Sequence, residues 1–368
     1  MSLSCIHSRA GCSITDGSGN IRPCCKFSRP QDLPDIFSVD SLNQYLDLDP
    51  YVGIRRSLDA GVFPSGCSSC ETMESAGLQS RRLYTESLYG DRPPAGGLVD
   101  LEIGLDYTCN MMCRSCGAGA SSRWGAADSV LSEFDRLEIP SQARSDYGAY
   151  ARRFRELLAG TDLSAVRHCK IEGGEPFYSR NLEGFLTQLA DHAQDPRRVQ
   201  LNIFTNGSVF PSARVLDLLD RFDTSITFSL DAVGDLAECV RWGVPWSVVE
   251  ANLRRWRALD RWDPVTCTTV SILTANAIGS LVEFCAGIDL RMDFSELTNP
   301  RYLSMYQLDL ETRSRWRLGI PEFDRLLMAD IHYEPEFERL RESTRILDQY
   351  QGVDFARVNP EIARLVGL

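Results

Sequence analysis

The sequence predicts an α/β protein built on a partial (β/α)6 parallel barrel, preceded by a loop-rich N-terminal segment and followed by a helical C-terminal extension. Three observations support this fold class. From about residue 98 onward, short strand-like runs alternate with longer helical ones, and strands joined by helical crossovers imply a parallel sheet. The strands themselves alternate apolar and polar residues. Most of the 13 cysteines lie before residue 117, outside the repeating part.

The barrel is expected to hold six strands, at residues 98–105, 166–172, 199–205, 225–231, 267–273 and 291–297. Helices are expected between them, at residues 147–158, 181–192, 212–222, 247–259 and 278–286. The Pro- and Gly-rich run at residues 92–97 reads as a joint. We therefore predict three parts, covering residues 1–92, 93–300 and 301–368, with Pro321 and Pro335 at helix starts in the last part.

The alternation within the strands predicts what their two faces contact. In the first strand, Asp100 and Glu102 alternate with Leu101 and Ile103. Buried parallel strands usually read as continuous apolar runs, so one face is expected to pack on helices while the other lines a polar, accessible lumen. A sheet with one solvated face is the alternative. Glu102 and Lys170 are expected on the same, lumen-facing side of adjacent strands. In that position they either form an ion pair or anchor a substrate.

Composition and charge exclude several classes of partner. The net charge of −12 argues against nucleic acid or an anionic membrane surface as the main partner. Neither a signal peptide nor an apolar run near the ~18 residues of a membrane-spanning helix is visible. Cysteines without a signal peptide read as thiolate metal ligands in a reducing compartment, and not as disulfides. The expected location is the cytoplasm.

Three cysteines follow the first predicted strand at a spacing that suits an iron–sulfur cluster. Cys109, Cys113 and Cys116 can hold three corners of a [4Fe–4S] cluster, which leaves the fourth iron open for an outside ligand. A structural zinc site would need a fourth ligand nearby, and the next candidates are His168 and Cys169. A zinc site or purely structural thiols remain the alternatives.

Further candidate residues follow the next three predicted strands, at the carboxyl ends where α/β proteins build their sites. The second strand runs into two glycines, which let a backbone approach a ligand closely. A plain turn or a capping hydroxyl is the structural alternative for the later positions. The candidates are Gly173, Gly174, Glu175, Pro176, Asn206, Ser229 and Asp231.

Together, the CxxxCxxC spacing at residues 109–116 and the GGEP run at residues 173–176 resemble the radical S-adenosylmethionine (SAM) enzymes. The resemblance extends over roughly residues 5–310. It implies that SAM chelates the open iron, that the GGEP backbone and Glu175 bind the SAM amino group, and that Asn206, Ser229 and Asp231 occupy later SAM-contacting positions. One departure is Ser115, where many members carry an aromatic residue that packs near adenine.

The N-terminal cysteines resemble an auxiliary-cluster module of the twitch or SPASM type, in which a metal substitutes for a core too small to fold. The resemblance implies Cys5, Cys24, Cys67 and Cys70 as ligands, with Cys25 as the alternative to Cys24. Cys12 falls at a strand position. Structural zinc on the same four thiolates is the other reading. In twitch and SPASM proteins such a module is expected after the barrel, whereas here it precedes it.

The resemblance implies reductive cleavage of SAM to a 5′-deoxyadenosyl radical that abstracts a substrate hydrogen. The leading substrate class is a ribosomally made peptide that is crosslinked, oxidised or epimerised, with flavodoxin or ferredoxin as electron donor. The alternatives are a small-molecule substrate such as a sugar or nucleotide, and a non-catalytic iron–sulfur or zinc scaffold. Cys239, on the loop side after the fourth strand, is a candidate hydrogen-atom donor, although buried cysteine is often only a small hydrophobe.

Overall fold

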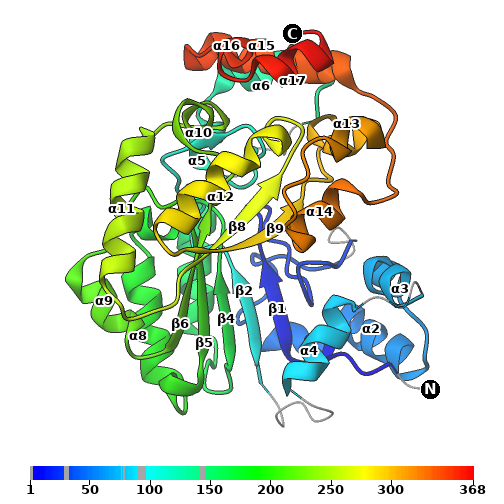
Figure 1. Cartoon of the computed structure of the whole chain (residues 1–368). Coiled ribbons are helices and arrows are strands. Elements are labelled where there is room, and N and C mark those ends of the chain that lie inside the picture. The colour runs from blue at the N-terminus through cyan, green and yellow to red at the C-terminus, as the bar shows by residue number, and fades with distance from the viewer. Residues whose placement is uncertain (1–2, 29–32, 76, 78, 90–96, 141–145) are drawn as a thin grey trace. The chain divides into compact units, whose positions relative to one another are not determined.

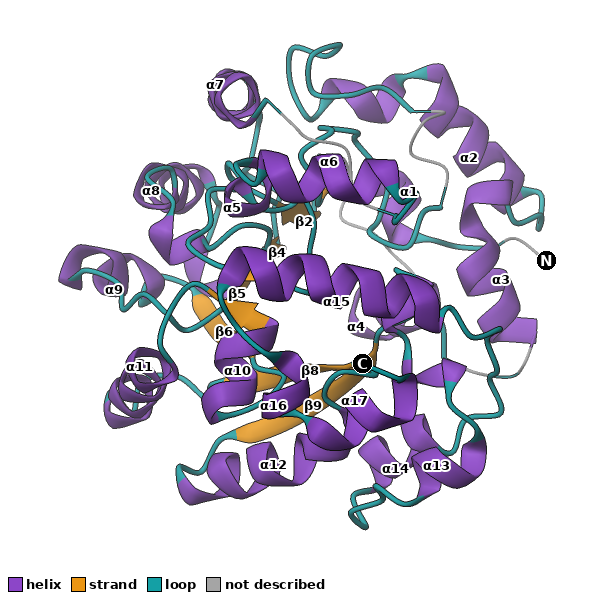
Figure 2. Cartoon of the chain, turned by 90° about the horizontal axis from the view of Figure 1, so that it is seen from above, coloured by secondary structure: helices purple, strands orange, loops and turns teal. Residues whose placement is uncertain are grey.

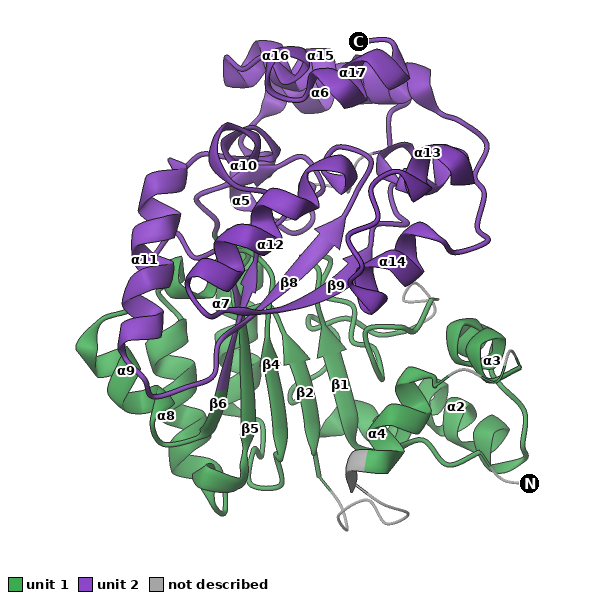
Figure 3. Ribbon diagram, in the orientation of Figure 1, with its two compact units in different colours: residues 1–108, 144–203, 211–224 green, residues 109–143, 204–210, 225–368 purple. Residues whose placement is uncertain are grey.

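The computed structural model describes the chain except residues 1–2, 29–32, 76, 78, 90–96 and 141–145, and the chain divides into two compact units (Figure 3). Unit 1 comprises residues 1–108, 144–203 and 211–224. Unit 2 comprises residues 109–143, 204–210 and 225–368. Of the predicted joint at residues 92–97, only Gly97 lies within the described residues, so the three-part division stays a prediction.

Seven strands form one sheet, in the order β1-β2-β4-β5-β6-β8-β9 (Figure 1). Their bounds are β1 Gly11–Ile14, β2 Asp100–Ile103, β4 His168–Ile171, β5 Gln200–Thr205, β6 Asp223–Ser229, β8 Val265–Val270 and β9 Arg291–Glu296. The pairs β1–β2, β2–β4, β4–β5, β6–β8 and β8–β9 are parallel. The predicted α/β fold with a parallel sheet is therefore confirmed, and all six predicted strands are present. Closure into a (β/α)6 barrel stays a prediction.

Within the seven-stranded sheet, the strand that the sequence did not predict is β1. It comes from the cysteine-rich N-terminal segment and pairs in parallel with β2, which sets Cys12 opposite Leu101. All four of its residues are buried. The N-terminal segment is thus built into the edge of the sheet, and we attribute the missed strand to its short length and to the polar loops on both sides.

In unit 1, the helices after the first strands follow the predicted ranges. The helices of this unit are α1 Ile6–Ala10, α2 Asp49–Asp59, α3 Ser68–Ser75, α4 Arg81–Tyr89, α7 Tyr147–Ala159, α8 Leu182–His192 and α9 Ala213–Leu219. Helix α7 begins where the Asp146 carboxylate accepts from the backbone N–H of Ala149 at 2.8 Å, an N-cap. It buries Tyr150 and Phe154 at helical spacing. Helices α7, α8 and α9 follow one another along one side of the strands (Figure 2).

Unit 2 contains the remaining elements, including the C-terminal helices. Their bounds are β3 Met112–Cys113, α5 Ser122–Gly125, α6 Asp128–Arg136, α10 Gly234–Val240, β7 Arg241–Trp242, α11 Trp246–Ala258, α12 Ile278–Gly287, α13 Leu310–Ser314, α14 Pro321–Leu327, α15 Phe337–Gln351, α16 Phe355–Val358 and α17 Pro360–Val366. Pro321 opens α14 as predicted. Helix α15 lies beside α6 (Figures 1 and 2). Among the described residues, no helix is long and apolar enough to cross a membrane.

Two expectations about the polar face of β2 are wrong. Asp100 and Glu102 are 3% and 1% exposed, and so do not line an accessible lumen, because the N-terminal segment covers them. Glu102 pairs with Arg81 of α4 at 2.6 Å. Lys170 pairs instead with Glu172, two residues further along its own strand direction, at 2.7 Å. The predicted Glu102–Lys170 ion pair is therefore replaced by two separate pairs.

Candidate active site

The three cysteines of the CxxxCxxC run lie on one loop of unit 2 that is fastened by a short antiparallel ladder. Strand β3 within the loop pairs with β7, which sets Met112 opposite Trp242 and Cys113 opposite Arg241. Gly243 follows β7 at φ +130°, and a Cβ there would stand 2.6 Å from the Asn110 carbonyl oxygen. Only glycine therefore permits this close approach.

Side chains from the segment around α5 bind the backbone of the same loop. The indole Nε1 of Trp124 donates to the Cys113 carbonyl at 2.8 Å. The Ser122 hydroxyl accepts from the Cys109 N–H at 3.1 Å, and the Ser121 hydroxyl donates to the Met111 carbonyl, also at 3.1 Å. Loop backbone groups are thus hydrogen-bonded to neighbouring protein, which holds the loop in one conformation.

The thiols of Cys113 and Cys116 can act as metal ligands once they lose their protons. Burial raises the pKa of Cys116 to about 12. Burial also raises the pKa of Cys113, and the nearby positive charge of Arg241 opposes that rise. Because a thiolate is the ligand, metal binding must displace these protons. A metal at the loop would supply the charge that keeps the buried sulfurs deprotonated, so these residues fit a thiolate-bound cluster.

The described residues contain no group of three or more His, Cys, Asp or Glu side chains close enough to hold a single metal ion. This finding bears on a one-ion zinc site, in which all ligands converge on one centre. In a [4Fe–4S] cluster each cysteine binds a different iron, so the sulfurs need not converge on one point. The finding therefore concerns a single bound ion, and not a cluster on Cys109, Cys113 and Cys116.

Arg241 and Asp231 form a buried ion pair beside Cys113. The Arg241 Nε and Nη2 atoms each lie 2.8 Å from Oδ2 of Asp231, and Nη1 lies 3.9 Å from the Cys113 sulfur. The other carboxylate oxygen of Asp231 accepts from the Thr269 N–H at 2.9 Å. Asp231, a predicted SAM-contacting residue, is thus bound to protein groups through both oxygens, and its role toward SAM stays a prediction.

A second buried arginine ties the loop to the C-terminal helices of unit 2. Arg114 donates through Nε to the Cys239 carbonyl at 3.1 Å and through Nη2 to the Asp348 carboxylate of α15. From the same helix, the Gln351 amide donates to the Met112 carbonyl at 3.2 Å. The segment between Cys113 and Cys116 is therefore anchored to a helix more than 200 residues away along the chain.

Asn206, another predicted site residue, is placed by contacts within unit 2. Its amide donates to Oδ1 of Asn110 in the cysteine loop at 3.1 Å. Its own Oδ1 accepts from the Ser208 N–H at 2.9 Å. Gly207 has φ +73°, and its carbonyl accepts from Asn252 at 3.0 Å. The structure thus joins the Asn206 turn to the cysteine loop, and the role of Asn206 toward SAM stays a prediction. Ser229 is the last residue of β6 and is half-buried.

The GGEP run belongs to unit 1 and forms a tight turn. Gly173 and Gly174 have φ +86° and +65°, and a Cβ on Gly174 would stand 2.6 Å from the Thr108 carbonyl oxygen. Both positions therefore need glycine. Glu175 is 1% exposed; its N–H donates to the Thr108 carbonyl at 2.8 Å, and its carboxylate accepts from the Phe177 N–H at 3.0 Å. Pro176 begins the short helix that follows.

The four N-terminal cysteines predicted as ligands line one cavity in unit 1. Cys5, Cys24, Cys67 and Cys70 share it with apolar and basic residues: His7, Lys26, Phe27, Leu58, Phe63, Gly66, Arg81 and Arg82. The Cys25 sulfur is directed elsewhere, 3.6 Å from Oε1 of Glu102. Cys12 is buried within β1. Cys24 thus lines the cavity, whereas the adjacent Cys25 does not. The assignment of the ligands stays a prediction.

Cys239 lies in α10 with its side chain in the hydrophobic core of unit 2. It is 1% exposed, and burial raises the pKa of its thiol to about 11. Its carbonyl is the acceptor for Arg114. These facts describe a packing residue that also anchors the cysteine loop, and the hydrogen-donor role stays a prediction.

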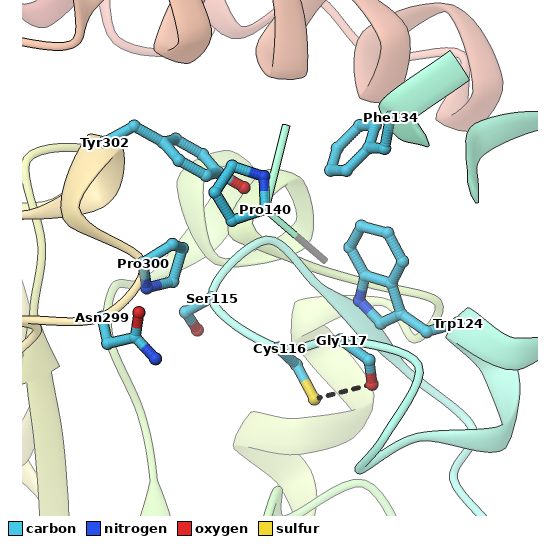
Figure 4. Close-up of a pocket in the computed structure, with 9 residues that line it drawn as sticks. All are labelled: Ser115, Cys116, Gly117, Trp124, Phe134, Pro140, Asn299, Pro300 and Tyr302. Carbon is cyan, nitrogen blue, oxygen red and sulfur yellow. Dashed lines mark hydrogen bonds between the residues drawn. The ribbon is translucent and has the colours of Figure 1, made fainter. Parts of the chain in front are cut away.

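A cavity of about 120 Å³ lies beside the third cysteine of the loop (Figure 4). Its lining is largely aromatic and prolyl, and consists of Ser115, Cys116, Gly117, Trp124, Phe134, Pro140, Asn299, Pro300 and Tyr302. Ser115 is the position at which the resemblance described above led us to expect an aromatic residue. Its small side chain borders this space, so a larger residue at position 115 would fill part of it.

Sequence reasoning missed the residues that fasten the loop through long-range contacts. Asp348 and Gln351 lie in a charged helix with no motif around them, so nothing in the sequence signalled their contact with Arg114 and Met112. Arg114, which lies between two cysteines predicted as ligands, was the one available signal, because a charge at a buried loop needs a partner.

No protein-family model matches the chain, and no curated protein matches it. Solved structures with detectable similarity include SuiB of Streptococcus suis bound to S-adenosylmethionine, at 14% identity over 62% of this chain and 45% of that chain, with a TM-score of 0.37. They also include anSMEcpe with bound AdoMet and Cp18Cys peptide, at 15% identity, 58% and 55% coverage and a TM-score of 0.39. TYW1 with a lysine-pyruvate adduct bound is 14% identical, with 67% and 80% coverage and a TM-score of 0.37.

This chain spans about half the length of SuiB and of anSMEcpe. At such low identity and TM-scores, the similarities assign no activity, substrate or partner to the chain. The candidate site therefore has to be interpreted from its own residues.

Proposed function

We propose that this chain is a radical SAM enzyme in which Cys109, Cys113 and Cys116 hold a [4Fe–4S] cluster that binds SAM at its open iron. The observation that supports it is the cysteine loop itself: three thiols at this spacing on a loop whose backbone bonds to α5, β7 and α15. A loop that serves only as a connection does not need anchors on three elements. S-adenosylmethionine is also bound in SuiB and anSMEcpe, but that similarity is too low to carry the proposal.

Within this proposal, the chain's own residues bind and orient the cofactor. Backbone groups of the turn at Gly173 and Gly174 bind the SAM amino group in this proposal, and the Glu175 carboxylate adds a charge-assisted hydrogen bond. Asn206, Ser229 and Asp231 contact the remainder of SAM. When bound, the reduced cluster and SAM supply a 5′-deoxyadenosyl radical that takes a hydrogen atom from the substrate.

The proposal assigns a second, auxiliary iron–sulfur cluster to Cys5, Cys24, Cys67 and Cys70. Its support is the single cavity that all four residues line. Arg81 and Arg82 border the same cavity, and cationic side chains suit a centre made of thiolates and sulfides, which carries net negative charge. Zinc held by the same cysteines is the competing outcome, and metal analysis separates the two.

A ribosomally made peptide is the substrate class we favour, because the N-terminal cysteine pattern resembles twitch and SPASM modules. The proposal places the protein in the cytoplasm, where a flavodoxin or ferredoxin supplies the electron. A small-molecule substrate such as a sugar or nucleotide remains the alternative.

The test is anaerobic reconstitution followed by iron and product analysis. The wild-type protein should bind about eight irons, two cubanes' worth, and should form 5′-deoxyadenosine from SAM under dithionite. The triple variant with alanine at positions 109, 113 and 116 should keep about four irons and form no 5′-deoxyadenosine. A triple variant that still cleaves SAM would show that the assignment of the loop is wrong.

A further inference from the structure

The side chain of Arg241 is aimed at one of the three loop cysteines. Arg241 and Cys113 are directly paired residues of the β3–β7 ladder, and Nη1 of the guanidinium lies 3.9 Å from the Cys113 sulfur, within donor range of a sulfur acceptor. The Arg241 side chain is 14% exposed. A nearly buried cationic donor beside a metal-binding sulfur is an arrangement that acts on the metal centre.

The guanidinium is fixed in this orientation by its partner. Nε and Nη2 of Arg241 both bind Oδ2 of Asp231, which is 6% exposed, and Oδ1 of Asp231 is in turn held by the Thr269 N–H of β8. With two of its nitrogens occupied on one side, the planar fork presents Nη1 toward Cys113. The positive end of this ion pair is therefore the end nearer to the sulfur.

We propose that Arg241 raises the reduction potential of the cluster bound at Cys113 and that Asp231 limits that rise. This inference rests on the proposed function, because it assumes a cluster on the cysteine loop. Hydrogen bonds to the sulfurs, net charge and exposure are what set the potential of an iron–sulfur cluster. Arg241 supplies both a hydrogen bond and a positive charge at one sulfur.

The expected signs follow from the charge that reduction adds. One electron from the donor, dithionite in vitro, adds one unit of negative charge beside Cys113, and no proton is transferred. The guanidinium stabilises that added charge, which favours reduction, and the Asp231 carboxylate opposes it from further away. Because interactions weaken with distance and strengthen with burial, the arginine dominates.

A purely structural ion pair predicts a different result. If the pair only held β7 and the segment after β6 in place, losing either partner would loosen the loop and both variants would change in the same direction. If Arg241 and Asp231 act through their charges, the two variants shift the potential in opposite directions. The direction of the two shifts therefore decides between the readings.

The experiment compares Arg241→Met, Asp231→Asn and wild type in full-length reconstituted protein without SAM. The midpoint potential is measured by EPR-monitored titration, and the triple alanine variant supplies the signal of the auxiliary cluster for subtraction. At a fixed ambient potential, the ratio of reduced to oxidised loop cluster should be about tenfold lower in Arg241→Met than in wild type. For a one-electron couple, this corresponds to a midpoint potential that is about 59 mV lower. In Asp231→Asn the ratio should rise.

The matched control is Asp348→Asn, which removes the carboxylate partner of Arg114, a buried arginine within the cysteine loop. Arg114 binds a carbonyl and helix α15, so the control should leave the potential close to that of wild type. Should Arg241→Met lose iron, Arg241→Lys keeps the charge and gives an intermediate potential. Shifts of equal sign in Arg241→Met and Asp231→Asn, or none in either, overturn the inference. Absence of a loop cluster from the wild-type protein would instead contradict the proposed function.

Discussion

The carboxylate of Glu102 accepts a hydrogen bond from the backbone N–H of Cys25 at 3.1 Å. It also binds the guanidinium of Arg81 at 2.6 Å. A single side chain of β2 thus joins the cysteine-rich N-terminal segment to the central sheet at two points. Because Glu102 is almost fully buried, its charge depends on those partners for stabilisation.

Glu102→Gln should therefore destabilise the folded protein by about 1.5–3 kcal/mol, the size of a hydrogen bond to a charged group. The measurement is the free energy of unfolding in urea at pH 7. Glu183→Gln is the matched control, because Glu183 pairs with Arg214 at the surface, where the two side chains are 46% and 67% exposed. Such surface pairs contribute about 0–1 kcal/mol. Equal losses in the two variants would show that burial of Glu102 does not matter.

The same pair predicts a pH dependence. Burial alone would raise the pKa of Glu102, but Arg81 and Lys170 lower it below its ordinary value of 4.5. A carboxyl whose pKa is lowered on folding stabilises the protein above its unfolded pKa, and that stabilisation is lost as pH falls through the folded pKa. The difference in stability between wild type and Glu102→Gln should therefore be full near neutral pH and shrink below about 4.5. A difference that stayed constant down to acidic pH would contradict this.

Cys24 and Cys25 should behave differently although they are adjacent. Cys24 lines the cavity shared with Cys5, Cys67 and Cys70, whereas the Cys25 sulfur lies beside Glu102. Cys24→Ser should remove the auxiliary cluster, about four irons per chain, and Cys25→Ser should keep it. Iron and zinc analysis of both variants makes the comparison. Loss of metal from Cys25→Ser alone would reverse the assignment, and zinc in place of iron would make the site structural.

Glu175 allows its charge to be separated from its structural role. Its carboxylate caps the Phe177 N–H, so alanine would remove both the cap and the charge. Glu175→Gln keeps an oxygen that can cap the turn, and should weaken SAM binding about tenfold or more, as for a lost charge-assisted hydrogen bond. Calorimetry at unchanged iron content measures this. Wild-type SAM affinity in Glu175→Gln would remove the carboxylate from the site.

The sequence was sufficient to predict six strands of the sheet and the five helices between them, because strand-like runs from residues 98–105 to 291–297 alternate with helical runs. It could not predict that β1 joins the sheet edge, since four residues among loops give too short a pattern. The accessible lumen at Asp100 and Glu102 was a wrong expectation for a different reason. Alternation shows which residues share a face, but not what covers that face.

For the candidate site, too, some features could be predicted from the sequence and others could not. The spacing of Cys109, Cys113 and Cys116 could be read directly because the ligands are close in sequence. The partners of the loop could not, because Asp348 meets Arg114 across more than 200 residues and its helix carries no motif. A buried arginine needs a carboxylate partner. The sequence contains many acidic residues, however, and does not show which of them meets Arg114.

Cys239 gives the most open prediction. If the reaction is a redox-neutral inversion, the substrate radical must regain a hydrogen atom from a donor on the face opposite to abstraction. A thiol is suited to this because its S–H bond is weaker than most C–H bonds. Cys239→Ala would then still form 5′-deoxyadenosine but no inverted product, and wild-type product made in deuterium oxide would gain one solvent deuteron.

The structure favours the other outcome. The Cys239 side chain is buried in the core of unit 2, and its carbonyl, which alanine retains, is the group that binds Arg114. We therefore expect Cys239→Ala to keep both the loop and product formation, and expect a product two hydrogens lighter than the substrate, with the auxiliary cluster accepting the electron. Mass spectrometry of the product distinguishes the cases. Since alanine leaves a small cavity, a loss of about 1–2 kcal/mol in stability should be the main effect, and loss of product alone, at full SAM cleavage, would return Cys239 to the role of hydrogen donor.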